Sequence, residues 1–318
     1  MARACLQASG HRTTGLHGAR LVTEALGQRS LHSTSDFAHV LSTGLQTTLL
    51  REYPALASQI RQCFRRETAE NFKLISRLDI GNFPALLPVN EHGEFRRGPI
   101  IGEGRESYRI DTFGRVLSIT RQALINDDLG ALRRVLDSAP RAAADFESAF
   151  LVDLLESNPK LSDGKAVFHP DHLNLASVGT ALSIDALDLA IRAVERQTGV
   201  DGRRVDQTPR FLIVRPELRV VARKLLAEIQ ATKSEDVNPL AGALELVVEP
   251  RLTDPLAWYV AADPATVEGL EYAYLMGSEG PQTESRAGFE VDGVEVKVRL
   301  DYGASFLDWR GWYTNAGA

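Results

Sequence analysis

The residues best suited to chemistry lie in one short segment, Phe168-His169-Pro170-Asp171-His172. Its two histidines and its aspartate are residue types that bind metal ions or transfer protons. Metal-ligating histidines on a helix prefer a spacing of four residues, whereas Pro170 favours a loop here. The segment therefore predicts a hydrogen-bonded turn. The alternative is a metal-dependent hydrolase that uses His169, Asp171 and His172.

Other candidate sites are weaker. The sequence has no Gly-x-x-x-x-Gly-Lys phosphate loop and no Gly-x-Ser-x-Gly nucleophile elbow, and Gly102-Glu-Gly104 is only a fragment of a phosphate-binding loop. Cys63 has arginine neighbours that would lower a thiol pKa, but a plain buried cysteine is favoured. Asp127 and Asp128 suit a helix N-terminus better than a catalytic carboxylate pair. We therefore expect no catalytic residue, no cofactor and no metal.

Composition narrows the class of protein. The 318 residues are 44% hydrophobic and 25% charged, which excludes wholesale disorder. The apolar runs are far shorter than the ~20 residues of a membrane-spanning helix. Two cysteines, Cys5 and Cys63, cannot form a disulfide framework. The net charge of −6 argues against nucleic-acid binding as the main feature, although residues 1–35 carry +3 and the remainder −9.

The candidate residues must be positioned by several elements. Residues 1–35 predict a flexible basic leader or N-terminal arm that is open to processing. Residues 36–71 predict a helical arm, with helices at 37–53 and 55–64. Residues 72–118 predict two strands, at 72–78 and 109–119, separated by segments rich in Pro and Gly.

This 72–118 segment has too little apolar material for a core of its own. Its charges balance between 81 and 116, and large apolar residues are few. Such a long connection is uncommon inside a compact domain. The segment therefore predicts a projecting β-ribbon. Because a lone two-stranded ribbon is marginally stable in water, it must lie on its own body or on a neighbouring subunit.

The remaining elements predict two further regions and a tail. Residues 119–180 contain a helical rod at 127–157, with caps near Asn126 and Ser138 and a stripe at Ala143, Phe146, Phe150 and Leu154. Residues 181–275 predict an α/β unit with strands at 211–214, 244–248, 258–261 and 270–276. In that unit Ser183 caps a helix, and Pro216 opens a second. The first helix is expected to turn Leu187, Ala190, Ile191 and Val194 inward. The apolar positions of the second are Val220, Val221, Leu225 and Ile229. Residues 276–318 contain a hairpin at 288–300 around Asp292-Gly293 and an aromatic tail.

Six segments together resemble one known family. They are 119–128 (ITRQALINDD), 167–175 (VFHPDHLNL), 238–250 (NPLAGALELVVEP), 271–281 (EYAYLMGSEGP), 288–299 (GFEVDGVEVKVR) and 308–313 (DWRGWY). In this order they resemble the Mu-like (gpT-like) major head subunits of tailed bacteriophages, and the resemblance covers about 36–318. It implies an α+β chain with the Hong Kong-97-type capsid fold. That fold has an N-terminal arm, an extended ribbon called the E-loop, a peripheral domain with a long spine helix, and an axial domain.

The resemblance also implies how the parts are used. The ribbon at 72–118 becomes the E-loop, 127–157 the spine helix, 181–275 the axial domain, and 276–318 the return strands to the peripheral domain. The chain is expected to form hexamers and pentamers of an icosahedral shell around double-stranded DNA, without sequence-specific DNA binding. It would be located in the virion capsid, after assembly in the bacterial host cytoplasm. A scaffold, a prohead protease, a portal and decoration proteins are compatible partners, and no membrane is implied.

The expected contacts between subunits lie in the ribbon. They are Phe83, Leu86, Leu87, Phe95, Arg96, Arg97, Ile100, Ile101, Arg105 and Tyr108. Some capsids of this fold crosslink a ribbon lysine to an asparagine of a neighbour, but residues 81–116 contain no lysine, so no crosslink is expected. The rival with the same fold is an encapsulin-like nanocompartment shell, which would enclose a cargo enzyme in place of DNA.

Overall fold

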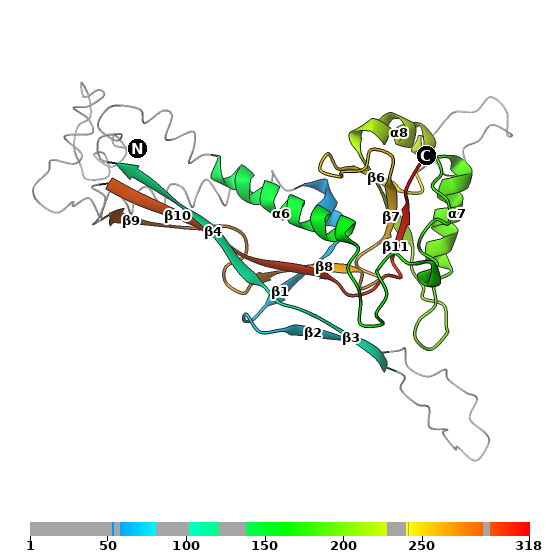
Figure 1. Ribbon diagram of the computed structural model, residues 1–318, viewed down its shortest axis with the longest axis horizontal. Coiled ribbons are helices and arrows are strands. Elements are labelled where there is room, and N and C mark those ends of the chain that lie inside the picture. The colour runs from blue at the N-terminus through cyan, green and yellow to red at the C-terminus, as the bar shows by residue number, and fades with distance from the viewer. Residues whose placement is uncertain are drawn as a thin grey trace, which may run out of the picture. The chain divides into compact units, whose positions relative to one another are not determined.

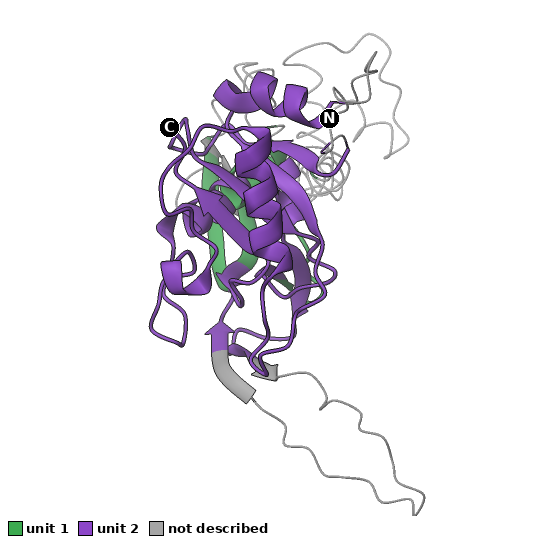
Figure 2. Cartoon of the chain, turned by 90° about the vertical axis from the view of Figure 1, so that its right-hand side faces the viewer, with its two compact units in different colours: residues 1–57, 111–147, 274–302 green, residues 58–110, 148–273, 303–318 purple. Residues whose placement is uncertain are grey.

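The computed structural model describes residues 53, 58–80, 102–120, 138–227, 240, 242–288 and 293–318. The chain divides into two compact units, each assembled from segments far apart in the sequence (Figure 2). Unit 1 comprises Met1–Ala57, Asp111–Glu147 and Tyr274–Tyr302. Unit 2 comprises Ser58–Ile110, Ser148–Ala273 and Gly303–Ala318.

Unit 2 contains a four-stranded sheet in the order β11-β7-β5-β6. Its strands are β5 (Pro209–Val214), β6 (Glu245–Val248), β7 (Trp258–Ala262) and β11 (Trp312–Asn315). Figure 1 labels β6, β7 and β11. β5 is parallel to β6 and antiparallel to β7. An unbroken apolar run is typical of a strand covered on both faces, and β5 is buried at every position except Arg210. The three strands predicted here, at 211–214, 244–248 and 258–261, are confirmed.

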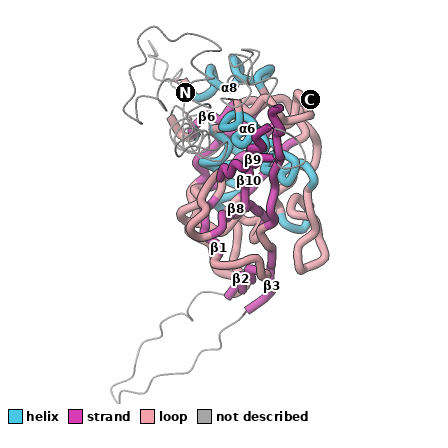
Figure 3. Tube along the Cα trace, turned by 90° about the vertical axis from the view of Figure 1, so that its left-hand side faces the viewer, coloured by secondary structure: helices cyan, strands magenta, loops and turns pink. Residues whose placement is uncertain are grey.

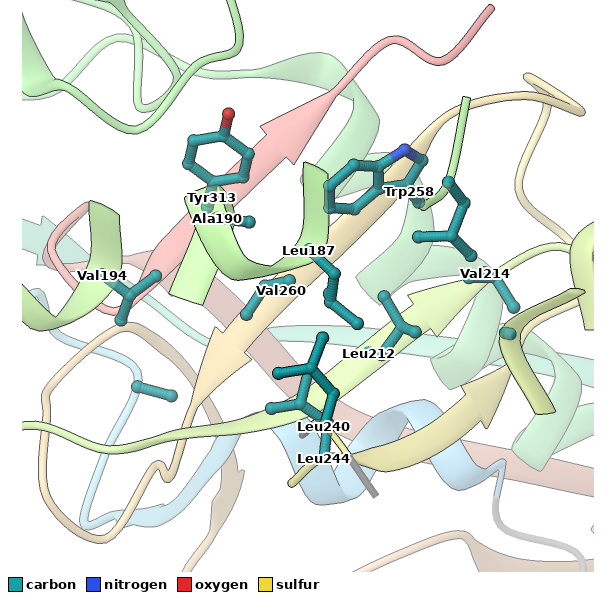
Figure 4. Close-up of a cluster of buried hydrophobic side chains, with 13 residues drawn as sticks. Leu187, Ala190, Val194, Leu212, Val214, Leu240, Leu244, Trp258, Val260 and Tyr313 are labelled. Carbon is teal, nitrogen blue, oxygen red and sulfur yellow. The ribbon is translucent and has the colours of Figure 1, made fainter. Parts of the chain in front are cut away.

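Two helices flank this sheet. α7 (Ile184–Glu195) begins after Ser183, whose hydroxyl accepts the Ala186 N–H, as the sequence predicts. Its inward side chains, Leu187, Ala190 and Val194, pack on β5 and β7 residues such as Leu212 and Val260 (Figure 4). Ile191, the fourth predicted position, is only partly buried.

The second helix is confirmed in part: Leu225 packs against the core, but Val220 and Val221 point outward. A 3₁₀ turn, η3 (Pro216–Leu218), leads into α8 (Arg219–Leu226). Val220 is 58% exposed and Val221 41%, while Ala222 is fully buried. The cause is that α8 approaches its neighbours through its smallest side chain, so that the two valines point outward. Ile229 lies outside the described residues.

The predicted rod is described only in its second part. α6 (Ala139–Ser157) begins one residue after the predicted cap Ser138, and 127–137 lie outside the described residues. The buried face contains Ala144, Leu151 and Leu155. The predicted stripe at 143, 146, 150 and 154 is therefore offset by one position, because its members are only partly buried. Glu147 belongs to the buried face, and that charge hid the true stripe from a hydrophobic pattern.

A second sheet has the order β1-β8-β10-β4, with β9 also paired to β10. Its strands are β1 (Arg65–Ala69), β4 (Asp111–Thr120), β8 (Leu270–Leu275), β9 (Gln282–Gly288) and β10 (Gly293–Phe306). A short 3₁₀ turn, η1 (Gln59–Cys63), precedes β1. A strand at 270–276 was predicted, and it is present as β8. Its predicted place in the α/β unit is wrong, because β8 pairs in this sheet and not with β5, β6 or β7.

The predicted turn at Asp292-Gly293 was wrong. In the β9–β10 hairpin Gly293 is already a strand residue and pairs with Gly288, so the connection is 289–292, which lies outside the described residues. This register places Lys297 opposite Glu284 and Glu295 opposite Arg286, and both pairs form ion contacts at 2.6 Å. Opposite charges across a strand pair stabilise a register, and here they accompany the longer connection.

The ribbon also differs from its prediction. β2 (Ile75–Ile80) pairs with β3 (Gly102–Tyr108) as a separate two-stranded sheet (Figure 3). The predicted strand at 109–119 is not the partner of β2, because the chain leaves the ribbon at 109–110 and continues as β4, which pairs with β10. Residue 110 cannot extend the ribbon since Ile110 is buried and Gly303 lies against this backbone. Residues 81–101 lie outside the described part of the chain.

Candidate functional site

The base of the β2–β3 ribbon is held by a buried carboxylate from β8. Glu271, which is 1% exposed, accepts from the Nη2 of Arg77 on β2 at 3.3 Å to both carboxylate oxygens. The hydroxyl of Tyr108 on β3 donates to Oε1 of Glu271 at 2.5 Å. Ile75 and Tyr108 are paired in the ladder, so these contacts fix the ribbon where it leaves the body.

A chain of surface-facing charges extends this cluster. Arg77 also lies 3.4 Å from Glu67 of β1, and Arg65 of the same strand lies 3.2 Å from Glu67. Arg65 reaches Glu268 at 3.0 Å. Because these side chains are about a third exposed or more, each such pair contributes little alone, at most about 1 kcal/mol. Their effect is to orient Arg77 toward the buried carboxylate of Glu271.

The pKa shifts at this base follow from burial and pairing. Burial raises the pKa of Glu271 above its usual value, against the opposing effects of the Tyr108 hydrogen bond and the Arg77 charge. Burial, followed by the hydrogen bond to Glu271, raises the pKa of Tyr108 strongly. Burial lowers the pKa of Arg77, but Glu271 outweighs it and the net direction is upward. Tyr108 therefore stays a hydrogen-bond donor and Arg77 stays charged at neutral pH.

A second contact joins strand β3 of the ribbon to the turn at 161–165. Glu106 on β3 accepts the backbone N–H of Ser162 at 2.6 Å. Ser162 belongs to a tight turn at 161–165, where Leu161 N–H donates to the Lys165 carbonyl. Glu106 stands opposite Arg77 in the ladder. The two strands of the ribbon are thus each held by a charged side chain at neighbouring positions.

This anchor was missed at the level of sequence. Glu271 lies 194 residues from Arg77 along the chain, and both look like ordinary polar positions in the sequence. The pattern that predicted a strand at 72–78 gave no sign that this strand would pair with a buried charge. Only the tertiary contact between β8 and the ribbon reveals the pair.

The predicted contact residues have two outcomes. Residues 83–101 of that set lie outside the described part, and Arg105 is described only as the ladder partner of Leu78. Tyr108 is 6% exposed in the single chain and its hydroxyl is bonded to Glu271, and its contact with a neighbouring subunit stays a prediction. Tyr108 is therefore an internal anchor of the ribbon.

The histidine segment forms the predicted hydrogen-bonded turn. It is a 3₁₀ turn, η2 (Pro170–His172), capped by His169, whose Nδ1 accepts the Asp171 N–H. His172 contacts the Val167 carbonyl oxygen through Nδ1 and Asp163 through Nε2. Both ring nitrogens of His172 therefore face oxygen partners outside the proposed ligand set. Within the described ranges, no three His, Cys, Asp or Glu side chains form a group able to hold a metal ion.

The weaker candidates are also placed. Gly102-Glu-Gly104 lies in strand β3 and forms no phosphate loop. Cys63 is buried, and burial raises the pKa of its thiol, assisted by Glu245 and partly opposed by Arg210. The plain buried cysteine is confirmed. Asp127 and Asp128 lie outside the described residues.

Comparison with known proteins identifies the family to which this chain belongs. A family model described as phage capsid protein matches residues 104–315, which is more than half of the chain. The chain belongs to this family of phage capsid proteins. A sequence search of curated proteins finds no match.

Solved structures agree with the family. A chain from the capsid of Cyanophage P-SCSP1u shares the fold with a TM-score of 0.54 and 10% identity, over 82% of this chain and 88% of that one. A chain of Microbacterium phage Oxtober96 gives 0.52 and 11% over 82% and 91%. A capsid chain of a native GTA particle gives 0.51 and 13% over 80% and 88%. The expected Hong Kong-97-type capsid fold is confirmed.

The chain is thus a major capsid protein, a structural component of the virion whose copies assemble into an icosahedral shell. In the described residues, no helix combines the length and the apolar character needed to cross a membrane. For such a protein the site of interest is the one that makes contacts between copies. Among the described elements, β2 and β3 adjoin the predicted contact residues in 83–101.

Proposed function

We propose that this capsid protein forms hexamers and pentamers of a phage head that encloses double-stranded DNA, and that the ribbon between β2 and β3 lies on a neighbouring subunit. The observation that carries the proposal is that β2 and β3 form a two-stranded sheet of their own. β2 and β3 pair only with each other among the described strands, while their base is fixed by a buried ion pair. An isolated two-stranded ribbon is only marginally stable in water. In the proposal the buried ion pair fixes the base of the ribbon, and contacts with a neighbouring subunit stabilise the rest of it.

Head-to-tail contacts of this kind close into rings when the rotation between copies allows it. Each ribbon contact is then one of many in the shell, and linked contacts reinforce one another through effective concentration. The proposed contacts are the apolar and arginine residues Phe83, Leu86, Leu87, Phe95, Arg96, Arg97, Ile100, Ile101 and Arg105.

The charge of the chain supports a shell that holds DNA without trapping it. The net charge is −6, and phosphate backbones would be retained by a strongly basic wall. Sequence-specific DNA binding is no part of the proposal. The motifs described above favour the Mu-like subfamily, assembly in the bacterial host cytoplasm, and cooperation with a scaffold, a prohead protease, a portal and decoration proteins.

The ribbon is tested by replacing residues 82–100 with Gly-Gly, which leaves β2 and β3 intact. We expect the variant to keep the circular dichroism spectrum and the thermal unfolding of the parent, and to form no closed particles in negative-stain electron microscopy. Normal shells from the shortened chain would refute the role of the ribbon.

A charge-matched comparison locates the contact. Changing Arg96 and Arg97 to glutamate is expected to abolish shells. The same charge change at Arg223→Glu and Lys224→Glu, two exposed positions of α8 outside the ribbon, is expected to leave them. Equal loss in both variants would mean that net charge, and not the ribbon, controls assembly.

The contents of purified particles separate the phage head from its rival. Double-stranded DNA inside particles from infected or induced cells supports the proposal, and a packaged enzyme without DNA would support an encapsulin-like shell. Because residues 81–116 contain no lysine, denatured shells are expected to run as single chains. Covalently linked ladders would contradict that expectation.

A further inference from the structure

His172 connects three separate segments of unit 2. Its ring, 5% exposed, stacks on Trp309 of the C-terminal tail at 4.1 Å and 11°. Its backbone carbonyl accepts from the Gln197 side chain just beyond α7 at 2.7 Å. Its two ring nitrogens reach back to the segment before η2, through the Val167 carbonyl at 2.9 Å and Asp163 at 2.8 Å.

The two ring contacts require two protons. A backbone carbonyl oxygen and a carboxylate are both acceptors, so each ring nitrogen must donate. A neutral imidazole carries one N–H only, and either tautomer would turn a lone pair toward an oxygen less than 3 Å away. The Val167 carbonyl cannot adapt, since the Asn174 side chain already donates to it at 2.8 Å. The geometry is satisfied by the imidazolium form alone.

Asp163 transmits this contact to the turn under the ribbon. Its Oδ2 is held by His172, and its Oδ1 accepts the Lys165 N–H at 2.9 Å. Partial burial raises the pKa of Asp163, but the hydrogen bonds from Lys165 and His172 outweigh it and the net direction is downward. The same turn presents the Ser162 N–H to Glu106 of β3. One continuous set of hydrogen bonds therefore runs from His172 to the ribbon.

We propose that protonated His172 is a positioning residue for the ribbon: it holds the 161–165 turn through Asp163, and the turn holds β3 through Ser162 and Glu106. Imidazole side chains in general lose this proton between pH 5 and 8. Loss of one ring proton removes one of the two ring contacts, so the turn loosens and β3 loses the contact between Glu106 and Ser162. At acid pH the arrangement persists until Asp163 takes up a proton, which its lowered pKa delays.

Other charges near His172 belong to the same small region. From its own turn they are His169 and Asp171, and Asp171 lies 2.7 Å from Lys165 of the supported turn. From the C-terminal tail Arg310 lies over the Trp309 ring at 4.4 Å, and Asp308 pairs with Arg310 at 2.9 Å. Asp163 is the carboxylate in direct contact with the His172 ring, so its removal is the sharpest perturbation.

The experiment uses the full-length chain and two measurements on the same samples from pH 5 to pH 8.5. Tryptophan emission reports the charge of His172, because an imidazolium stacked on an indole quenches its fluorescence. Hydrogen exchange followed by mass spectrometry, corrected for the intrinsic pH dependence of exchange, reports peptides covering 102–108 and 158–166. His172→Gln and Asp163→Asn are compared with His169→Gln, a matched control at the partly exposed neighbouring histidine.

In the parent chain we expect emission to rise with pH in one transition, and exchange at both peptides to rise at least threefold across it. His172→Gln is expected to lack the transition, and His169→Gln to retain it. Asp163→Asn is expected to keep the 158–166 peptide in fast exchange at every pH. A transition that survives His172→Gln, or one that leaves the 102–108 peptide unchanged, would overturn the proposal. The inference rests on the proposed ribbon role only for its consequence in assembly. Both readouts measure the single chain, so their result is independent of shell assembly. The His172 proposal can therefore be refuted while shells still form, or supported while no shells form.

Discussion

The hydrogen bond from Tyr108 to Glu271 offers the cleanest test of how the ribbon is anchored. Tyr108→Phe removes one hydroxyl and leaves a ring of the same shape in a buried site. The partner carboxylate is 1% exposed, so water cannot replace the donor that is lost. A hydrogen bond to a charged group contributes about 1.5–3 kcal/mol.

The contact between Glu271 and Arg77, which Tyr108→Phe retains, limits how much stability the variant loses. Arg77 stays 3.3 Å from both carboxylate oxygens, so the variant does not leave the charge unpaired. The loss should therefore stay below the 3–5 kcal/mol that a broken buried ion pair costs. We expect about 2 kcal/mol, equivalent to a fall of roughly 4–8 °C in Tm for a unit of this size.

The sign of the pH dependence follows from Glu271. Its folded-state pKa lies above the usual 4.5, so the folded chain binds more protons than the unfolded chain, and stability falls as pH rises through that window. The hydrogen bond from Tyr108 lowers the pKa of Glu271, so removing the Tyr108 hydroxyl raises the pKa of Glu271 further. The difference between parent and Tyr108→Phe should thus be largest at neutral pH and smaller below pH 4.5.

The assay is urea unfolding of the unassembled chain at pH 7 and pH 4, followed by circular dichroism. Tyr313→Phe is the matched control, because its ring is buried while its hydroxyl makes no hydrogen bond within the described part of the chain. We expect a change of less than about 0.5 kcal/mol for the control. A Tyr108→Phe variant no less stable than Tyr313→Phe, or a loss that grows toward acid pH, would refute this account of the anchor.

Three further predictions concern the body of the chain. Gly303→Ala places a Cβ 2.4 Å from the Arg109 carbonyl oxygen, so overpacking should cost about 1–3 kcal/mol in thermal unfolding, and a neutral result would mean that this crossing is loose. Leu187→Ala in the core between α7 and β5 should cost about 2–5 kcal/mol by urea unfolding, and a loss under 1 kcal/mol would contradict its burial. Because burial raises the pKa of Cys63, its alkylation measured by peptide mass spectrometry should be at least tenfold slower in the folded chain than in urea, and equal rates would show the thiol to be accessible.

The spacing of residue types determined many local elements of this protein. The apolar run of β5, the Ser183 cap and the inward face of α7 all follow from short-range patterns, because each depends on residues within one or two turns or one strand. The turn around His172 could likewise be predicted, since Pro170 restricts the backbone locally. The lack of core material between β2 and β3 also pointed to a projecting ribbon before any fold was known.

Only the tertiary structure showed which charged side chains are buried. Glu147 and Glu271 read as surface positions, and both are buried because partners from distant segments meet them: Tyr274 at Glu147, and Arg77 and Tyr108 at Glu271. The same cause moved the ribbon's second strand from 109–119 to β3, shifted the β9–β10 turn, and turned Val220 outward. Pairing across long sequence separations depends on which strands become neighbours, and no local pattern carries that information. The chain's composition thus identified a ribbon that needs support, while only the folded structure showed which buried carboxylate holds its base.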